Sequence, residues 1–152
     1  MSPRARVTLT GAVDSRTGAV IDVRRGRGPR VLFLPHSADC DECRAYAAAL
    51  DARNEEIGEW GGRTSIVLGA AADAAADAFP ARMQVLRDVT STAGAMPAAV
   101  IIADEWGEVQ FSIEAVADHA LPDMTEVVEW VRFISIHCPE CEQPEGEWRS
   151  VG

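Results

Sequence analysis

The stretch that decides the fold is "RVLFLPHSADCDEC", residues 30–43. Residues 31–35 are a continuous apolar run closed by proline, which is typical of a strand buried on both faces. From Cys40 onward, apolar positions recur at helical spacing. A helix that begins at Cys40 places its sulfur among unsatisfied backbone N–H groups, which favour a thiolate, and puts Cys43 one turn further in. This spacing predicts a working dithiol.

Strands and helices alternate along the rest of the chain. The expected strands are 7–10, 19–23, 31–35, 63–69, 97–104 and 107–113, and the expected helices are 40–57, 71–79 and 123–136. The first helix buries one stripe and stops at Gly58; the stripe holds Cys43, Tyr46, Ala47, Leu50, Asn54 and Ile57. Asp123 caps the last helix, with Glu126 three positions on. The order predicts an α/β domain with an N-terminal β-hairpin and a central mixed β-sheet.

Composition excludes several classes of function. All 14 basic residues among the 152 are arginine, so the chain has no lysine for a Schiff base or a phosphate-binding loop. Residues 1–30 hold seven Arg and two Asp, but the chain as a whole carries a net charge of −10, which disfavours nucleic acid as a partner. No apolar run is long enough for a membrane span or a secretion signal, so we expect a cytoplasmic protein.

In a cytoplasmic protein, four cysteines arranged as two CxxC pairs indicate redox chemistry or metal ligation. Three motifs carry a family resemblance: "LFLPHSADCDEC", "GAMPAAVIIAD" and "DEWGEVQF". Together they resemble the thioredoxin-like superfamily, specifically its redoxin branch of thioredoxin and peroxiredoxin relatives. The resemblance implies a three-layer α/β/α domain over residues 1–136, followed by a tail over 137–152. It also implies that Pro97 is cis and faces Cys40, and that Met96 offers backbone groups to a partner's extended chain.

The first CxxC departs from the thioredoxin pattern in two ways. "DCDEC" replaces "WCGPC", and the strand before it lacks a buried acid. His36 is the residue that could move a proton there, although a solvated loop histidine is the alternative interpretation. Peroxiredoxins use the pattern Pro-x-x-x-Thr/Ser-x-x-Cys, with seven positions from the proline to the cysteine and four to the Thr or Ser. Here Cys40 follows Pro35 by only five positions, and Ser37 follows it by two. A peroxidase is therefore a further alternative and not the main interpretation.

The second CxxC, Cys138 and Cys141, follows the last helix directly and lies beside His137. Three interpretations stay open: a redox tail, half of a zinc site, or a reduced and exposed tail. Because the last helix spans about 21 Å, one site built from all four cysteines of a single chain is not expected. His119 is interpreted as a loop residue, and Trp130, one position off the buried stripe, as a packing residue or a contact in a homodimer.

The function that the sequence favours is thiol–disulfide exchange, in which Cys40 attacks a partner disulfide and Cys43 releases the reduced partner. The partners expected are a disulfide-containing protein or a small thiol, and electrons would come from another protein or a small thiol. No organic cofactor is implied. The competing class is a non-enzymatic assembly module on a redoxin scaffold, whose CxxC pairs hold zinc between subunits; Cys138 and Cys141 are the candidate ligands of a zinc ion.

Overall fold

The computed structural model describes residues 12–14, 17–21, 28–35, 40–68, 78–88, 98–105, 108–115 and 121–136. Seven strands and three helices lie in these residues. The strands are β1 (Ala12–Asp14), β2 (Val20–Ile21), β3 (Arg30–Leu34), β4 (Arg63–Leu68), β5 (Gln84–Asp88), β6 (Ala98–Ala103) and β7 (Val109–Ala115). The helices are α1 (Asp41–Ala52), α2 (Asn54–Glu59) and α3 (Met124–Ile136).

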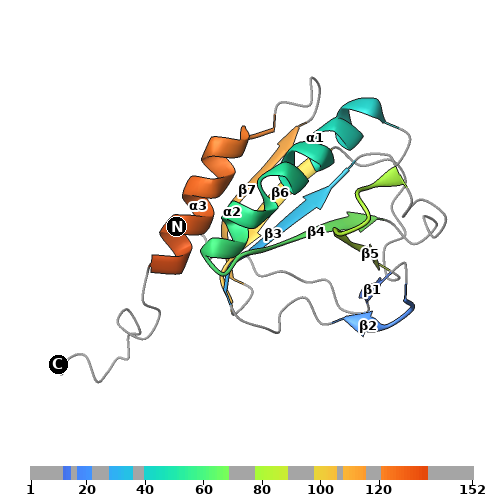
Figure 1. Ribbon diagram of the computed structural model, residues 1–152, viewed down its shortest axis with the longest axis horizontal. Helices are drawn as coiled ribbons and strands as arrows, with labels where there is room; N and C mark the ends of the chain where they lie inside the picture. The colour runs from blue at the N-terminus through green and yellow to red at the C-terminus, as the bar shows by residue number, and fades with distance from the viewer. Residues whose placement is uncertain are drawn as a thin grey trace.

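The strands form one mixed sheet in the order β2-β1-β5-β4-β3-β6-β7 (Figure 1). β3 lies near the middle, parallel to β4 and antiparallel to β6. β5 continues the parallel part beyond β4, and β7 closes the other side as an antiparallel neighbour of β6. The predicted α/β class, the central mixed sheet and the hairpin of the last two strands are confirmed.

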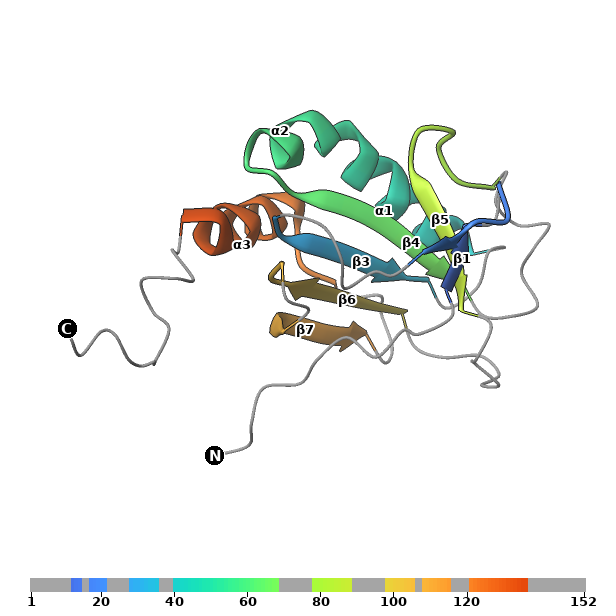
Figure 2. The same ribbon diagram turned by 90° about the horizontal axis from the view of Figure 1, so that it is seen from below.

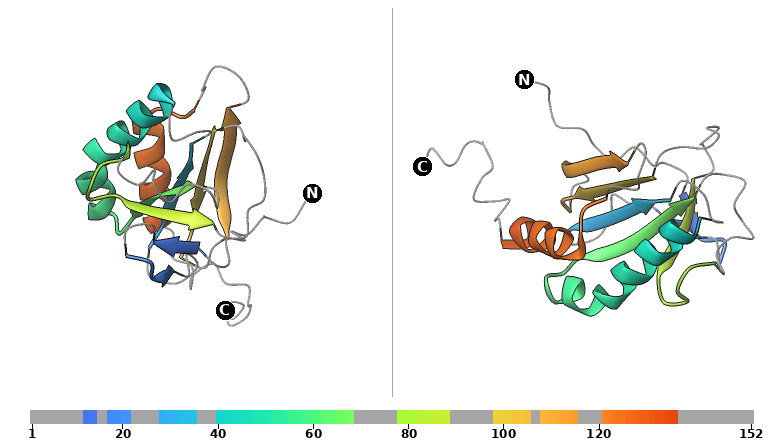
Figure 3. Two further views of the ribbon diagram at one scale, coloured as in Figure 1. Left: turned by 90° about the vertical axis from the view of Figure 1, so that its right-hand side faces the viewer. Right: turned by 90° about the horizontal axis from the view of Figure 1, so that it is seen from above.

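The three helices cover one face of the sheet (Figure 2 and Figure 3). Alternate residues of the strands point toward them and form the main core with the buried stripes of the helices. The buried members of this core include Val31, Phe33, Cys43, Ala47, Leu50, Ile57, Ile66, Val85, Val100, Ile102, Val127 and Val131. The opposite face holds a small cluster around Leu32, Val67 and Leu86. The helix expected over 71–79, which would supply the third layer, lies almost entirely outside the described residues.

Three predictions of local structure are wrong in detail. The first strand of the hairpin is β1, which lies inside the predicted turn; residues 7–10 are outside the described part. β5 is a strand that the sequence did not predict, because "QVLRD" is short and follows a proline turn. The first long helix is divided at Arg53, where φ is −103° and ψ is 8°. At this point the Arg82 side chain donates a hydrogen bond to the carbonyl oxygen of Asp51. In a continuous helix that carbonyl oxygen would accept a backbone N–H four residues further on.

The last helix begins as predicted. The backbone N–H of Glu126 donates to Oδ1 of Asp123 at 2.8 Å, which is an N-cap interaction. Val127, Val128, Val131 and Ile134 are buried against the sheet. The capping residue and the helical spacing of apolar residues therefore place α3 correctly from sequence alone.

Candidate functional site

Cys40 is the N-cap residue of α1. Its backbone is extended, with φ −77° and ψ 118°, while its carbonyl oxygen accepts the N–H of Arg44 at 3.0 Å. The sulfur lies close to the first helical turn and accepts the backbone N–H of Cys43 at 3.3 Å. The sulfur therefore lies at the N-terminus of α1, where the first backbone N–H groups of the helix point. The side chain is half-buried, so one side of it faces solvent.

Cys43 lies beneath Cys40, inside the main core. It has no exposed surface and belongs to the same apolar cluster as Ala47 and Leu50, one and two turns further along α1. One sulfur at the surface and the other buried below it is the arrangement that the CxxC spacing predicted.

The two residues between the cysteines point away from the protein. Asp41 and Glu42 are exposed, and Asp41 pairs with Arg44 at 2.7 Å, which places a positive charge one turn from the acids. Because this ion pair is in solvent, its contribution to stability is small. Asp41 and Glu42 are thus solvated side chains rather than part of a buried cluster.

Tyr46 holds the site helix against the start of α3. Its ring packs on Phe33 with centroids 4.9 Å apart, and its hydroxyl donates to the carbonyl oxygen of Pro122 at 2.6 Å. Burial raises the pKa of Tyr46 well above its usual value, and the carboxylates of Asp123 and Glu126 raise it further. The group is therefore a permanent hydrogen-bond donor near neutral pH. Sequence analysis found this residue only as part of the helical stripe, since its contact partner is 76 positions away.

Several predicted site residues lie outside the described part of the chain. They are His36, Met96, Pro97, His119, His137, Cys138 and Cys141. No cis peptide bond occurs in the described residues, and the bond before Pro97 is not among them. The roles expected for these residues stay predictions, as does the division into a domain and a tail.

The described residues contain neither a cluster of metal ligands nor a membrane-spanning helix. No group of three or more His, Cys, Asp or Glu side chains there could hold a metal ion. In the same residues, every helix is too short or too polar to cross a membrane. α3 starts beside Tyr46 and runs for 13 residues, about 20 Å. The separation expected between the two CxxC pairs stays a prediction, because Cys138 and Cys141 lie outside the described residues.

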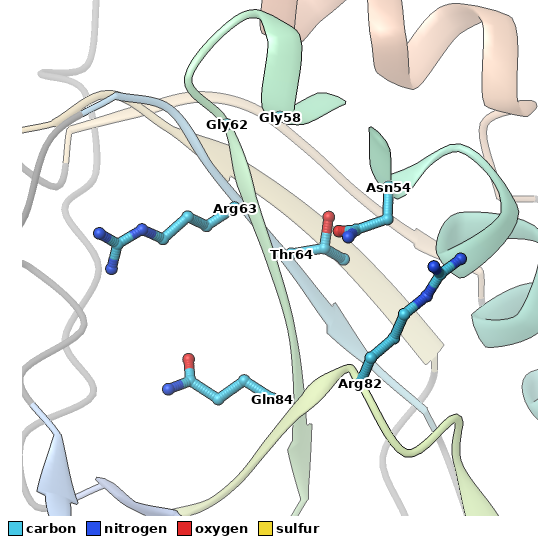
Figure 4. Close-up of a pocket in the computed structure, with 7 residues that line it drawn as sticks. All are labelled: Asn54, Gly58, Gly62, Arg63, Thr64, Arg82 and Gln84. Carbon is cyan, nitrogen blue, oxygen red and sulfur yellow. The ribbon is translucent and has the colours of Figure 1, made fainter. Parts of the chain in front are cut away.

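A polar cavity of about 280 Å³ lies at the opposite end of β4 from the site. It is lined by Asn54, Gly58, Gly62, Arg63, Thr64, Arg82 and Gln84. Figure 4 shows Asn54, Thr64 and Arg82 on one side of β4, with Arg63 and Gln84 pointing to the other side. Neither Cys40 nor Cys43 lines this cavity, so the cavity and the cysteine pair are separate features.

Comparison with known proteins supports the fold. No protein-family model matches the sequence, and no curated protein matches it. A peroxiredoxin-like protein from Aquifex aeolicus superposes with a TM-score of 0.62 and 16% identity, covering 88% of both chains. A thiol peroxidase from Chromobacterium violaceum gives 0.63 and 14%, covering 87% of both. A secreted disulfide oxidoreductase from Mycobacterium tuberculosis gives 0.60 and 17%, covering 81% of this chain and 94% of that one.

The chain has a thioredoxin-like α/β fold, and its structural neighbours are redoxins. The resemblance seen in the three sequence motifs is thus confirmed at the level of the fold. At these identities the comparison shows the fold alone, and the reaction has to be argued from the site.

Proposed function

We propose that the protein is a thiol–disulfide oxidoreductase that uses Cys40 and Cys43. The observation that carries the proposal is the half-buried Cys40 sulfur at the N-cap of α1, 3.3 Å from the N–H of Cys43, with the Cys43 side chain fully buried. An accessible sulfur at the start of a helix is placed to attack a disulfide. A second thiol one turn away can then resolve the mixed disulfide.

The reaction proceeds in two exchanges. The Cys40 thiolate attacks one sulfur of the partner disulfide; the Cys40–partner bond forms, the partner S–S bond breaks, and the leaving sulfur takes a proton. Cys43 then loses its proton and attacks the Cys40 sulfur, which releases the partner as a dithiol and leaves a Cys40–Cys43 disulfide. Two electrons pass from the protein to the partner. An external thiol, of a protein or a small molecule, restores the reduced pair.

The remaining roles follow from the family resemblance. Met96 and Pro97 would line the edge along which the partner's chain lies, and His36 would assist proton transfer. No organic cofactor takes part, and the expected compartment is the cytoplasm. The partner is a disulfide-containing protein or a small disulfide, not a nucleic acid or a membrane.

The test is reduction of a model disulfide substrate with a thiol as electron source. Cys40→Ser should abolish turnover, and Cys43→Ser should accumulate a mixed disulfide with the substrate, visible by mass spectrometry. The matched control is the double variant Cys138→Ser, Cys141→Ser, which leaves the first pair intact and should keep the activity. Full activity of Cys40→Ser would overturn the proposal.

Two other functions have specific support and separate outcomes. Peroxide reduction is favoured by neighbours described as a peroxiredoxin-like protein and a thiol peroxidase. It predicts peroxide consumption by the same cysteine, and faster turnover with peroxide than with disulfides would establish it. An assembly module with zinc held by Cys138 and Cys141, together with His137, predicts near-stoichiometric zinc after purification without added metal and no turnover in either assay.

A further inference from the structure

Two helices present exposed acids at the end of the molecule that carries Cys40. α1 and α3 both start at the end of the sheet to which β3 leads (Figure 1 and Figure 2). Asp41 and Glu42 are the first two residues of α1, and Asp123 and Glu126 lie at the start of α3. All four side chains are exposed. The acids therefore come from two segments that are far apart in the sequence.

A hydrogen bond fixes these two helix starts to each other. The hydroxyl of Tyr46, in the second turn of α1, donates to the carbonyl oxygen of the buried Pro122 at 2.6 Å. Burial raises the pKa of Tyr46, and the carboxylates of Asp123 and Glu126 raise it further. The electric field of the acids on α3 thus reaches the first turns of α1, which carry the exposed side of Cys40.

Positive charge does not balance these acids. Within residues 40–46 and 121–126, Arg44 is the single basic residue, against four acids. Arg44 donates to Asp41 at 2.7 Å, so its charge is offset by one of them. The two segments together keep a net charge of −3, because they hold four acids and one base. A molecule that approaches Cys40 from solvent therefore meets a negative potential.

We infer that the substrates of the pair are disulfides flanked by positively charged groups, as in a protein segment that carries lysine or arginine beside its disulfide. This inference rests on the proposed function of Cys40 and Cys43, and the exchange itself is the one given above. The acids of both helix starts would attract such a segment and repel one that carries acids. Asp41 and Glu42 should have the largest effect, because their Cα atoms lie within about 8 Å of that of Cys40.

The size of the effect follows from the charges. In water, one pair of unit charges about 10 Å apart changes a rate about two-fold. A disulfide with two flanking lysines differs by four charges from the same disulfide with two glutamates, and it meets a net charge of −3. We therefore expect the lysine form to react at least about tenfold faster at low salt. Because the four acids are solvated, they act on the approach of the substrate, and salt should remove the difference.

The test measures how fast three peptides oxidise the reduced full-length protein. The peptides share one intramolecular disulfide and differ only at two flanking positions, which hold lysine, serine or glutamate. Each rate is divided by the rate at which the same peptide reacts with 2-mercaptoethanol, an uncharged thiol, so that the intrinsic reactivity of the disulfide cancels. The lysine peptide should exceed the glutamate peptide at least about tenfold at an ionic strength of about 0.01 M. The ratio should approach one at about 1 M, where the screening length is about 3 Å.

Two double variants locate the acids responsible. Asp41→Asn with Glu42→Gln should lower the ratio of the lysine rate to the glutamate rate at least about threefold. The matched control, Glu55→Gln with Glu59→Gln, removes the same charge from exposed positions on α2, which follows α1 at the end away from Cys40, and should leave the ratio unchanged. The ratio is the quantity compared, because a change in the reactivity of the Cys40 thiol would affect all three peptides equally.

The outcomes separate this inference from the proposed function. Absence of exchange with the serine peptide would overturn the proposed function itself. Exchange with all three peptides at equal normalised rates, or faster exchange with the glutamate peptide, would overturn the charge preference and leave the function standing. If the control at Glu55 and Glu59 lowers the ratio as much as the variant at Asp41 and Glu42, the assignment to the acids beside Cys40 is wrong.

Discussion

Removal of one hydroxyl group tests how the site helix is held. In Tyr46→Phe the ring still packs on Phe33, but the 2.6 Å hydrogen bond to the carbonyl oxygen of Pro122 is lost. The bond joins α1 to the residues that lead into α3. Its loss should lower the free energy of unfolding by about 1 kcal/mol, the usual net value for one such bond with a partner left unpaired. For a domain of this size that corresponds to about 2–4 °C in Tm.

The stability difference between the wild type and Tyr46→Phe should depend on pH in a definite direction. The folded protein raises the pKa of Tyr46 above its ordinary value of 10. Stability from the protonated hydroxyl is therefore fully present below about pH 10, and it is lost as pH rises through the folded-state pKa. Tyr46→Phe has no such group. The advantage of the wild type should be constant from about pH 7 to 9 and should shrink at higher pH.

Two measurements check this. Urea unfolding of both proteins across this pH range gives the difference in stability. Ser135→Ala is the control: the exposed Ser135 hydroxyl donates to a carbonyl oxygen within α3. Its removal should lower the free energy of unfolding by less than about 0.5 kcal/mol. Tyr46 is the single tyrosine of the chain, so the tyrosinate absorbance band reports its titration directly. A wild-type advantage that grows above pH 10, or titration at the ordinary pKa in the folded protein, would refute the reasoning.

Three further predictions concern stability. Gly28→Ala should lower the free energy of unfolding by at least about 3 kcal/mol, because φ is 81° and the new Cβ would overlap the carbonyl oxygen of Gly61. Gly18→Ala, where φ is 77° and the space is open, should lower it by about 1 kcal/mol. Equal losses of the two variants in urea unfolding would contradict this. Leu50→Ala, at a fully buried position, should lose about 2–5 kcal/mol, and a loss under 1 kcal/mol would show that the core is not packed there. Asp123→Ala should lose about 1 kcal/mol and Asp123→Asn much less, measured by thermal unfolding.

Sequence reasoning was most successful where the signal is local. The apolar run of β3, the helical spacing from Cys43 to Leu50 and the cap at Asp123 each depend on neighbours within one or two turns. Such patterns fix burial directly, because the side-chain period differs between strands and helices. The position of Cys40 at the helix N-terminus followed from the same local pattern.

The features that were missed depend on distant partners. β5 pairs with β4 across an intervening segment, and nothing in "QVLRD" itself indicates that a neighbouring strand awaits it. The division of the first helix depends on Arg82 reaching Asp51 from 31 positions away. The bond from Tyr46 to Pro122 is equally invisible in a local window. Tertiary contacts of this kind override local preference.

The CxxC segment contains one residue of the hydrophobic core and two exposed acids side by side. Cys43 is part of the hydrophobic core, while Asp41 and Glu42 are exposed and Asp41 pairs with the exposed Arg44. Replacing those two acids would alter the charge near Cys40 and should change the free energy of unfolding only slightly. Under the proposed function, natural variation or protein engineering at these two positions would change the reduction potential of the pair while the scaffold stays unchanged.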